Sequence, residues 1–243
     1  MCIAVLSTGA HPRWRLVVAA NRDEYHARAA APVARWQDHS GIIAGRDLTG
    51  GGTWLGVHEA GRLVLVTNYR MPGYPQPGRP SRGALVADLL DGADPQAAPL
   101  ADYNPFTLVH IAGSEATLLT NHPDSKRTAL APGIHGVSNG PFDPPWPKTM
   151  QLWRRFERWL DADQSDLAPL FAALADDSPV EANATGPEAR FSGVFVRDPV
   201  YGTRCSTVVA VDHEGSGRIV EQRFDANGTV TGETAVPFAW PAL

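Results

Sequence analysis

Hydrophobic positions in this chain gather in short runs that are separated by turn-forming residues. Ten such runs, most of them rich in β-branched side chains, occupy residues 2–7, 15–21, 41–45, 53–58, 62–68, 106–113, 116–121, 193–198, 206–212 and 218–224. Short apolar runs between Gly, Pro, Asn and Asp clusters are typical of strands. The pattern therefore predicts a fold dominated by β-sheet.

Apolar residues at helical spacing form three segments. They are Leu85 with Leu89, then Leu152, Phe156 and Leu160, and finally Leu167, Leu170, Phe171 and Leu174. Residues three or four apart share one face of a helix, so these faces should belong to the core.

The order of the predicted elements favours two sheets rather than one. Five strands come first, followed by one helix, two strands, two helices and three strands. Neighbouring runs of this kind favour antiparallel pairing, and the few helices must cover exposed sheet faces. We expect an α+β fold of two packed antiparallel sheets flanked by helices. No linker or repeat divides the chain, so residues 1–243 should form a single domain.

Composition narrows the class of protein. The chain is 43% hydrophobic, enough for a sizeable core, and 21 basic against 26 acidic residues give a net charge of -5. Such a balance disfavours nucleic acid as a partner. The chain has no apolar stretch long enough to span a membrane and no signal-peptide pattern at its start, so we expect a cytoplasmic protein without a transmembrane segment. Only Lys126 and Lys148 are lysines.

Cysteine and histidine spacing gives no indication of a metal site. Two cysteines form no disulfide framework, and the eight histidines lack the spacing of zinc motifs. We expect no metal and no cofactor.

One proline-rich loop carries several arginines. The segment 70–82 contains four prolines together with Arg70, Arg79 and Arg82, so it cannot enter a sheet interior. It is either an ordinary surface connection or a lid that meets an anionic substrate.

Two glycine-containing motifs are better explained as turns. Residues 136–140, "GVSNG", fit the G-x-S-x-G nucleophile elbow, but the prolines that follow forbid the helix that this motif requires. Gly50, Gly51 and Gly52 precede a strand rather than a helix, which disfavours a phosphate-binding loop.

Cys2 stands directly behind the initiator methionine. Once Met1 is removed, this residue carries a thiol and a free α-amine, whose pKa values near ~8.5 and ~7.7–8.0 suit a nucleophile and its base. A buried free cysteine that simply packs in the core is the alternative.

Four polar residues, "NRDE" at positions 21–24, end the second predicted strand. Antiparallel pairing would set them against the start of the first strand, where Cys2 lies. Arg22 and Asp23 could then lower the thiol pKa and hold the amine. A solvated strand end would show the same residues.

These motifs resemble those of the NRDE family, to which the transport-and-Golgi-organisation protein of animals belongs. The shared segments are "GGGTWLGV", "VTNYR", "LLTN", "GVSNGPFDPPWPK" and "YGTRCSTVV", in this order, and they cover nearly the whole chain. The family is in turn similar to N-terminal-nucleophile hydrolases of the penicillin V acylase and bile-salt hydrolase branch. This resemblance implies a four-layer αββα sandwich.

The resemblance also implies roles for individual residues. Asp23 corresponds to the acylase Asp that holds the α-amine, and Asn68 corresponds to the oxyanion-hole Asn, whose amide N–H is worth about 3–4 kcal/mol. Asn121 falls on a second site Asn. In the acylases an Arg precedes the Asn of the "NRDE" stretch, but here that place is Ala20, and Arg22 shares its strand face.

Three hypotheses follow for function. The first is a cysteine hydrolase of linear amide bonds in a small molecule, in which Cys2 attacks, Arg22 and Asp23 tune it, and Asn68 holds the oxyanion. The residues expected to orient substrate are Asn21, Arg70, Asn121 and Arg204. The second is a non-catalytic carrier that binds haem or an acyl-CoA or other lipid ligand in the same pocket, as family associations suggest. The third is a structural protein with an unreactive Cys2.

Overall fold

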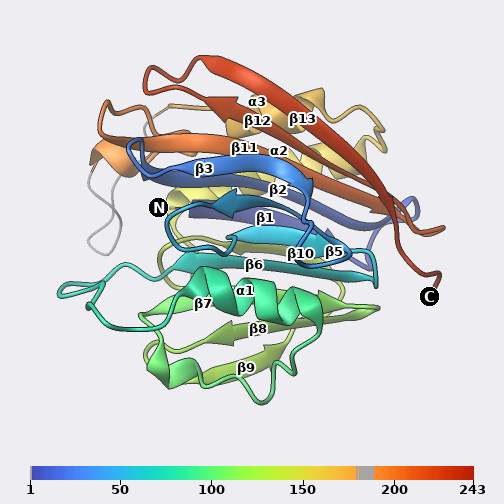
Figure 1. Cartoon of the computed structure of the whole chain (residues 1–243). Coiled ribbons are helices and arrows are strands. Elements are labelled where there is room, and N and C mark those ends of the chain that lie inside the picture. The colour runs from blue at the N-terminus through green and yellow to red at the C-terminus, as the bar shows by residue number, and fades with distance from the viewer. Residues whose placement is uncertain (1, 179, 181–188) are drawn as a thin grey trace.

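Two antiparallel sheets form the centre of the molecule, which we describe from a computed structural model (Figure 1). The structure describes residues 2–178, 180 and 189–243. The first sheet, sheet A, has six strands in the order β10-β1-β2-β11-β12-β13. Their bounds are β1 Cys2–Thr8, β2 Trp14–Tyr25, β10 Gly133–Val137, β11 Tyr201–Asp212, β12 Ser216–Phe224 and β13 Val230–Ala239.

The second sheet, sheet B, has seven strands that follow one another along the chain, from β3 to β9. Their bounds are β3 Ala30–Arg35, β4 Ile42–Asp47, β5 Leu55–His58, β6 Arg62–Asn68, β7 Phe106–Ala112, β8 Glu115–Thr120 and β9 Lys126–Ala129. Sheet B is therefore a meander of hairpins, whereas sheet A brings together strands from both ends of the chain.

Helices cover the two outer faces, which makes four layers and confirms the predicted sandwich. The first helix, α1 (Arg82–Asp91), packs its leucines on sheet B. Two further helices, α2 (Pro147–Asp161) and α3 (Ala168–Leu174), pack on sheet A. Short 3₁₀ turns at Leu100–Asp102 and Ala189–Phe191 complete the described elements. All three helical segments were predicted from their apolar spacing.

The alternation of side chains along β1 connects both cores to one strand. Ala4 and Leu6 point into the core between the sheets, and Ile3 and Val5 point toward α2 and α3. Successive strand residues face opposite sides, so a strand buried on both faces reads as one continuous apolar run. Cys2 is the first residue of this buried strand.

The strand predictions were wrong in two respects. Four strands were missed, β3, β9, β10 and β13, because their sequences lack a continuous apolar run. Conversely, residues 193–198, predicted as a strand, form bends and irregular chain. Val194 and Val196 are nevertheless buried, so their hydrophobicity reflects packing rather than pairing. In the described part of the chain no helix is long and apolar enough to cross a membrane.

Candidate active site

The site begins at the first residue of β1. In the ladder between β1 and β2, Cys2 lies opposite Arg22, and on the other side of β2 Arg22 lies opposite Cys205 of β11. Directly opposed residues in antiparallel strands project from the same face. Cys2, Arg22 and Cys205 therefore form one row across the end of sheet A.

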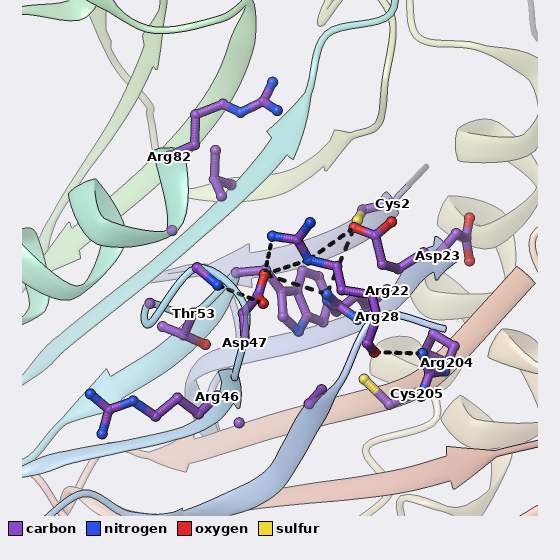
Figure 2. Close-up of a pocket in the computed structure, with 18 of the residues that line it drawn as sticks. Cys2, Arg22, Asp23, Arg28, Arg46, Asp47, Thr53, Arg82, Arg204 and Cys205 are labelled. Atoms are coloured by element: carbon purple, nitrogen blue, oxygen red, sulfur yellow. Dashed lines mark hydrogen bonds and ion pairs between the residues drawn. The ribbon is translucent and has the colours of Figure 1, made fainter. Parts of the chain in front are cut away.

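This row lines a cavity of about 450 Å³. Its wall comes from both sheets, from the "GGG" turn after β4, and from the end of the proline-rich loop where α1 begins. Figure 2 shows Cys2, Arg22 and Asp23 toward one end, with Arg82 and Arg46 across from them. Cys2 is only 8% exposed but is part of the cavity wall.

Strand alternation separates the polar residues of the "NRDE" stretch. The amide of Asn21 is on the helix side, where it donates to the carbonyl oxygens of Leu174 at 2.8 Å and Val194 at 3.0 Å. Its own oxygen accepts the Ser206 hydroxyl at 2.6 Å. Asn21 is thus fully hydrogen-bonded inside the protein and does not line the cavity. We assign it a structural role in place of the predicted contact with substrate.

Asp23 is buried beside the start of β1 and lines the cavity. Its carboxylate accepts the Thr203 hydroxyl at 2.7 Å, and its carbonyl oxygen accepts the Tyr201 hydroxyl at 2.8 Å. Burial raises the pKa of Asp23, while nearby positive charges, including those of Lys148 and Arg22, oppose the rise. The carboxylate is therefore held in a fixed place and depends on neighbouring cations for its charge.

The same environment governs the thiol. Burial raises the pKa of Cys2, the charge of Asp23 raises it further, and Arg22 lowers it. Burial likewise raises the pKa of Cys205, with a contribution from Glu221. Of the two thiols, only Cys2 lies at a chain end where an α-amine can become available.

Among the described residues seven arginines line the cavity, and most of them bind other groups of the protein. Arg28 binds Asp47 at 2.7 Å, Arg46 binds Asp38, and Arg223 contacts Glu221 at 3.2 Å. Arg79 and Arg204 donate to backbone carbonyl oxygens instead.

In the described part of the chain four of the seven have no carboxylate within 3.5 Å, and of these Arg22 and Arg82 make the fewest hydrogen bonds. Among the described residues, Arg22 has ion pairs only at 3.8 Å with Glu24 and 3.9 Å with Asp47. In that same part of the chain, Arg82 donates to the carbonyl oxygen of Pro105 at 3.0 Å and has no carboxylate within 4 Å. These two guanidinium groups therefore keep the most N–H donors for an anionic group of a ligand.

Asn68, at the end of β6, is exposed and lines the cavity, and its role at an oxyanion stays a prediction. Its carbonyl oxygen accepts the Asn139 amide at 2.7 Å. Asn139 follows β10 by two residues, and β10 pairs Val137 with Ala4 of β1. The same register, continued for two residues, brings Asn139 to the level of Cys2. Asn139 is not among the predicted site residues, because the segment "GVSNG" is interpreted there only as a turn.

Two other predicted site residues lie outside the cavity wall. Asn121 does not line the cavity and uses its amide to bind the backbone of Phe106, Leu100 and Tyr103. Arg70 also lies outside the cavity lining, 5.9 Å from the ring centre of Phe191. Substrate contact is therefore not assigned to either side chain.

Arg204 sits at a bulge between β11 and β2 and is part of the cavity wall. Its guanidinium donates to the carbonyl oxygens of Tyr25, His26 and Arg28 at 2.9–3.1 Å. Its main contact is thus with the β2–β3 turn, whose position it fixes. Within the described ranges no cluster of three or more His, Cys, Asp or Glu side chains is arranged to hold a metal ion.

This four-layer sandwich of two antiparallel sheets between helices has the same fold as two solved structures. The N-acylethanolamine-hydrolyzing acid amidase ortholog of Caenorhabditis elegans matches 85% of this chain and 92% of its own, with a TM-score of 0.53 and 9% identity. A variant of the conjugated bile acid hydrolase of Clostridium perfringens matches 97% of this chain and 92% of its own, with a TM-score of 0.53 and 8% identity.

The family follows from the sequence comparison. Residues 1–226 match the family model described as Transport and Golgi organisation 2, and the chain belongs to that family. The bovine Transport and Golgi organization protein 2 homolog is 32% identical over 96% of this chain and 97% of its own length. The human homolog is 29% identical over 91% of this chain and 92% of its own length.

Proposed function

We propose that the mature protein is a cysteine hydrolase that cleaves a linear amide bond of a small molecule. The observation that carries this proposal is the position of Cys2: a thiol at the start of a central strand, in the wall of a cavity, with Arg22, Asp23 and Asn68 in the same wall. Removal of Met1 frees the α-amine of the residue that carries this thiol. The nucleophile and its base then belong to one residue.

The reaction runs in two halves. The α-amine takes the proton of the Cys2 thiol as the sulfur attacks the amide carbonyl carbon, and the same proton passes to the leaving nitrogen when the C–N bond breaks. Water then attacks the thioester and releases the acid. Asn68 donates to the oxyanion, and Asp23 accepts a hydrogen bond from the amine and orients it.

The substrate carries an acidic group in this proposal. Arg22 and Arg82 have no carboxylate within 3.5 Å among the described residues and make the fewest hydrogen bonds of the cavity arginines, and they lie on different elements of the wall. An amide with a carboxylate, sulfonate or phosphate in one of its two parts would reach such a guanidinium while its carbonyl meets Cys2.

Turnover of a panel of N-acyl amides with and without an acidic group tests the proposal. Purified protein whose mass shows Met1 removed should hydrolyse acidic members of the panel, and Cys2→Ala should bind them without turnover. Cys205→Ala serves as the matched control because it removes the other cavity thiol, and it should retain turnover. Equal turnover by Cys2→Ala and the unchanged protein would refute the hydrolase.

A non-catalytic carrier is the second candidate, favoured by the arginine content of the cavity wall. The ligand would be an acyl-CoA or another acidic lipid, or haem. No histidine is among the described residues that line the cavity, so a haem would have to take a thiolate of Cys2 or Cys205 as its protein ligand. A haemin titration that gives no Soret shift would rule out haem as the ligand. Saturable binding of an acyl-CoA without any turnover would favour the carrier over the hydrolase.

A further inference from the structure

Lys148 is a buried basic residue that has no role in the mechanism proposed above. It lies in the first turn of α2 and is 1% exposed. In the described part of the chain its Nζ has no hydrogen-bond partner and no carboxylate within 4 Å. A buried ammonium group without a partner is costly, so its presence in the core requires a reason.

The surroundings of Lys148 point toward the head of β1. Burial lowers the pKa of Lys148, whereas the negative charges of Asp23 and of a Cys2 thiolate act in the opposite direction. Arg70 is the other charge that acts on it. Lys148 does not line the cavity, so it acts on the site from the helix side of sheet A.

Several charged and titratable groups surround the Cys2 thiol. Arg22 and Asp23 come from β2, Arg82 from α1, Cys205 from β11 and Lys148 from α2. Asp23 alone would raise the pKa of a free α-amine and keep it protonated, in which form it is no base. Asp23 is two residues from Asn21 in β2 and shares its strand face, the side of sheet A on which α2 and Lys148 pack, so the positive charge of Lys148 counteracts this effect.

We propose that Lys148 is a positioning residue for the N-terminal cysteine, an inference that rests on the proposed function. Its ammonium group holds Asp23 as a carboxylate that orients the α-amine, and it balances the carboxylate's charge. The amine therefore remains a base near neutral pH, and the thiolate is favoured over the thiol. Lys148 makes no contact with substrate and takes no proton.

The pH dependence of Cys2 alkylation tests this role without any substrate. Iodoacetamide labelling of Cys2 would be followed by mass spectrometry in the protein that has lost Met1, in Lys148→Met, and in Lys126→Met as an exposed lysine control. Lys148→Met should move the midpoint of the rate profile up by about one pH unit, so that labelling near neutral pH slows about tenfold. Lys126→Met should leave the midpoint unchanged.

A double variant shows whether Lys148 acts through Asp23. Adding Lys148→Met to Asp23→Asn should move the midpoint by much less than one unit, because the carboxylate that Lys148 balances is already gone. Circular dichroism and the melting temperature show which variants are folded. If Lys148→Met does not fold, Lys148→Gln is used in its place. A folded Lys148→Met or Lys148→Gln protein with the unchanged midpoint would overturn the inference. A shifted midpoint in a protein that hydrolyses no amide would instead count against the proposed function alone.

Discussion

At the scale of single residues, the carboxylate of Asp47 orders one wall of the cavity. It binds Arg28 at 2.7 Å and accepts the backbone N–H groups of Thr49 and Gly50 at 3.0 Å each. Burial raises its pKa, but these hydrogen bonds outweigh burial, and the pKa lies below its ordinary value. The charged carboxylate therefore stabilises the folded state above that ordinary value and loses this effect as the pH falls.

Asp47→Asn should consequently destabilise the protein in a pH-dependent way. We expect a loss of about 1–2 kcal/mol at pH 7, because the amide cannot replace the charged acceptor of Arg28. The loss should shrink below about pH 4, as the carboxyl of the unchanged protein takes up its proton. Urea denaturation at pH 7 and at pH 3 measures both values, and an equal loss at the two pH values would contradict the assignment.

Asn68 should contribute to turnover more than to binding. If its amide meets the oxyanion, Asn68→Ala should lower kcat by about 10²–10³-fold and change KM little. Asn104→Ala is a matched control, because Asn104 also lines the cavity but uses its amide on Gln76. A raised KM with unchanged kcat would show that Asn68 binds substrate and not the oxyanion.

The position of the proposed nucleophile could be predicted from the sequence, but most of the residues around it could not. Cys2 and Arg22 follow from strand pairing, since a hairpin sets the end of one strand beside the start of the other. One feature of the sequence indicated that Lys148 is buried: it lies four residues before Leu152, on the apolar face of α2. No feature of the sequence indicated that Asn121 binds three backbone groups, because hydrogen bonds between distant segments leave no local sequence pattern.

At the scale of elements, a close approach of two backbones joins α1 to the cavity wall. A Cβ on Gly52 would lie 2.2 Å from the carbonyl carbon of Gly83, in the first turn of α1. Thr53 donates its N–H to the Gly83 carbonyl oxygen at 3.2 Å, which closes the contact. Only glycine at position 52 lets the helix that carries Arg82 come this near.

Gly52→Ala should therefore push α1 away and destabilise the protein. We expect a loss of more than about 2 kcal/mol, since the clash is with backbone and no side chain can give way. Gly51→Asn is the control, because nothing lies within 4 Å of a Cβ there and asparagine tolerates its positive φ. Thermal unfolding compares the two variants, and equal melting temperatures would contradict a packing role for Gly52.

Elements with strong apolar patterns were predictable, and edge elements were not. β1, β2 and β6 are buried on both faces over most of their length, and each contains a continuous apolar run. β13 and β9 are edge strands with mostly exposed side chains, so their pairing rests on backbone hydrogen bonds that any sequence can make. Burial, rather than pairing, is what the hydrophobic pattern reports.

At the scale of the whole molecule, one core joins the two sheets. The same cluster contains Leu6 and Val209 from sheet A together with Leu65 and Val109 from sheet B. Neither sheet can lose this interface without exposing the inner face of the other. The chain should therefore unfold as a single unit, in keeping with the expectation of one domain.

Leu65→Ala tests this coupling. The residue is fully buried between the sheets, so the substitution should cost about 2–5 kcal/mol and shift the whole transition to lower temperature. Circular dichroism and tryptophan fluorescence should give coincident curves before and after the change. Separate transitions for the two probes would mean that the sheets unfold independently.

The proposed hydrolase activity depends most on the chemical state of Cys2 in functional protein. Intact-mass and peptide analysis of material that turns over an amide measures it directly, before and after a brief reaction with that substrate stopped by acid. We predict a mass lower by one methionine residue and, after reaction, an acyl group on Cys2 that is absent from Cys2→Ala. Active protein that still carries Met1, or an acyl group that forms on Cys205 instead, would contradict the account.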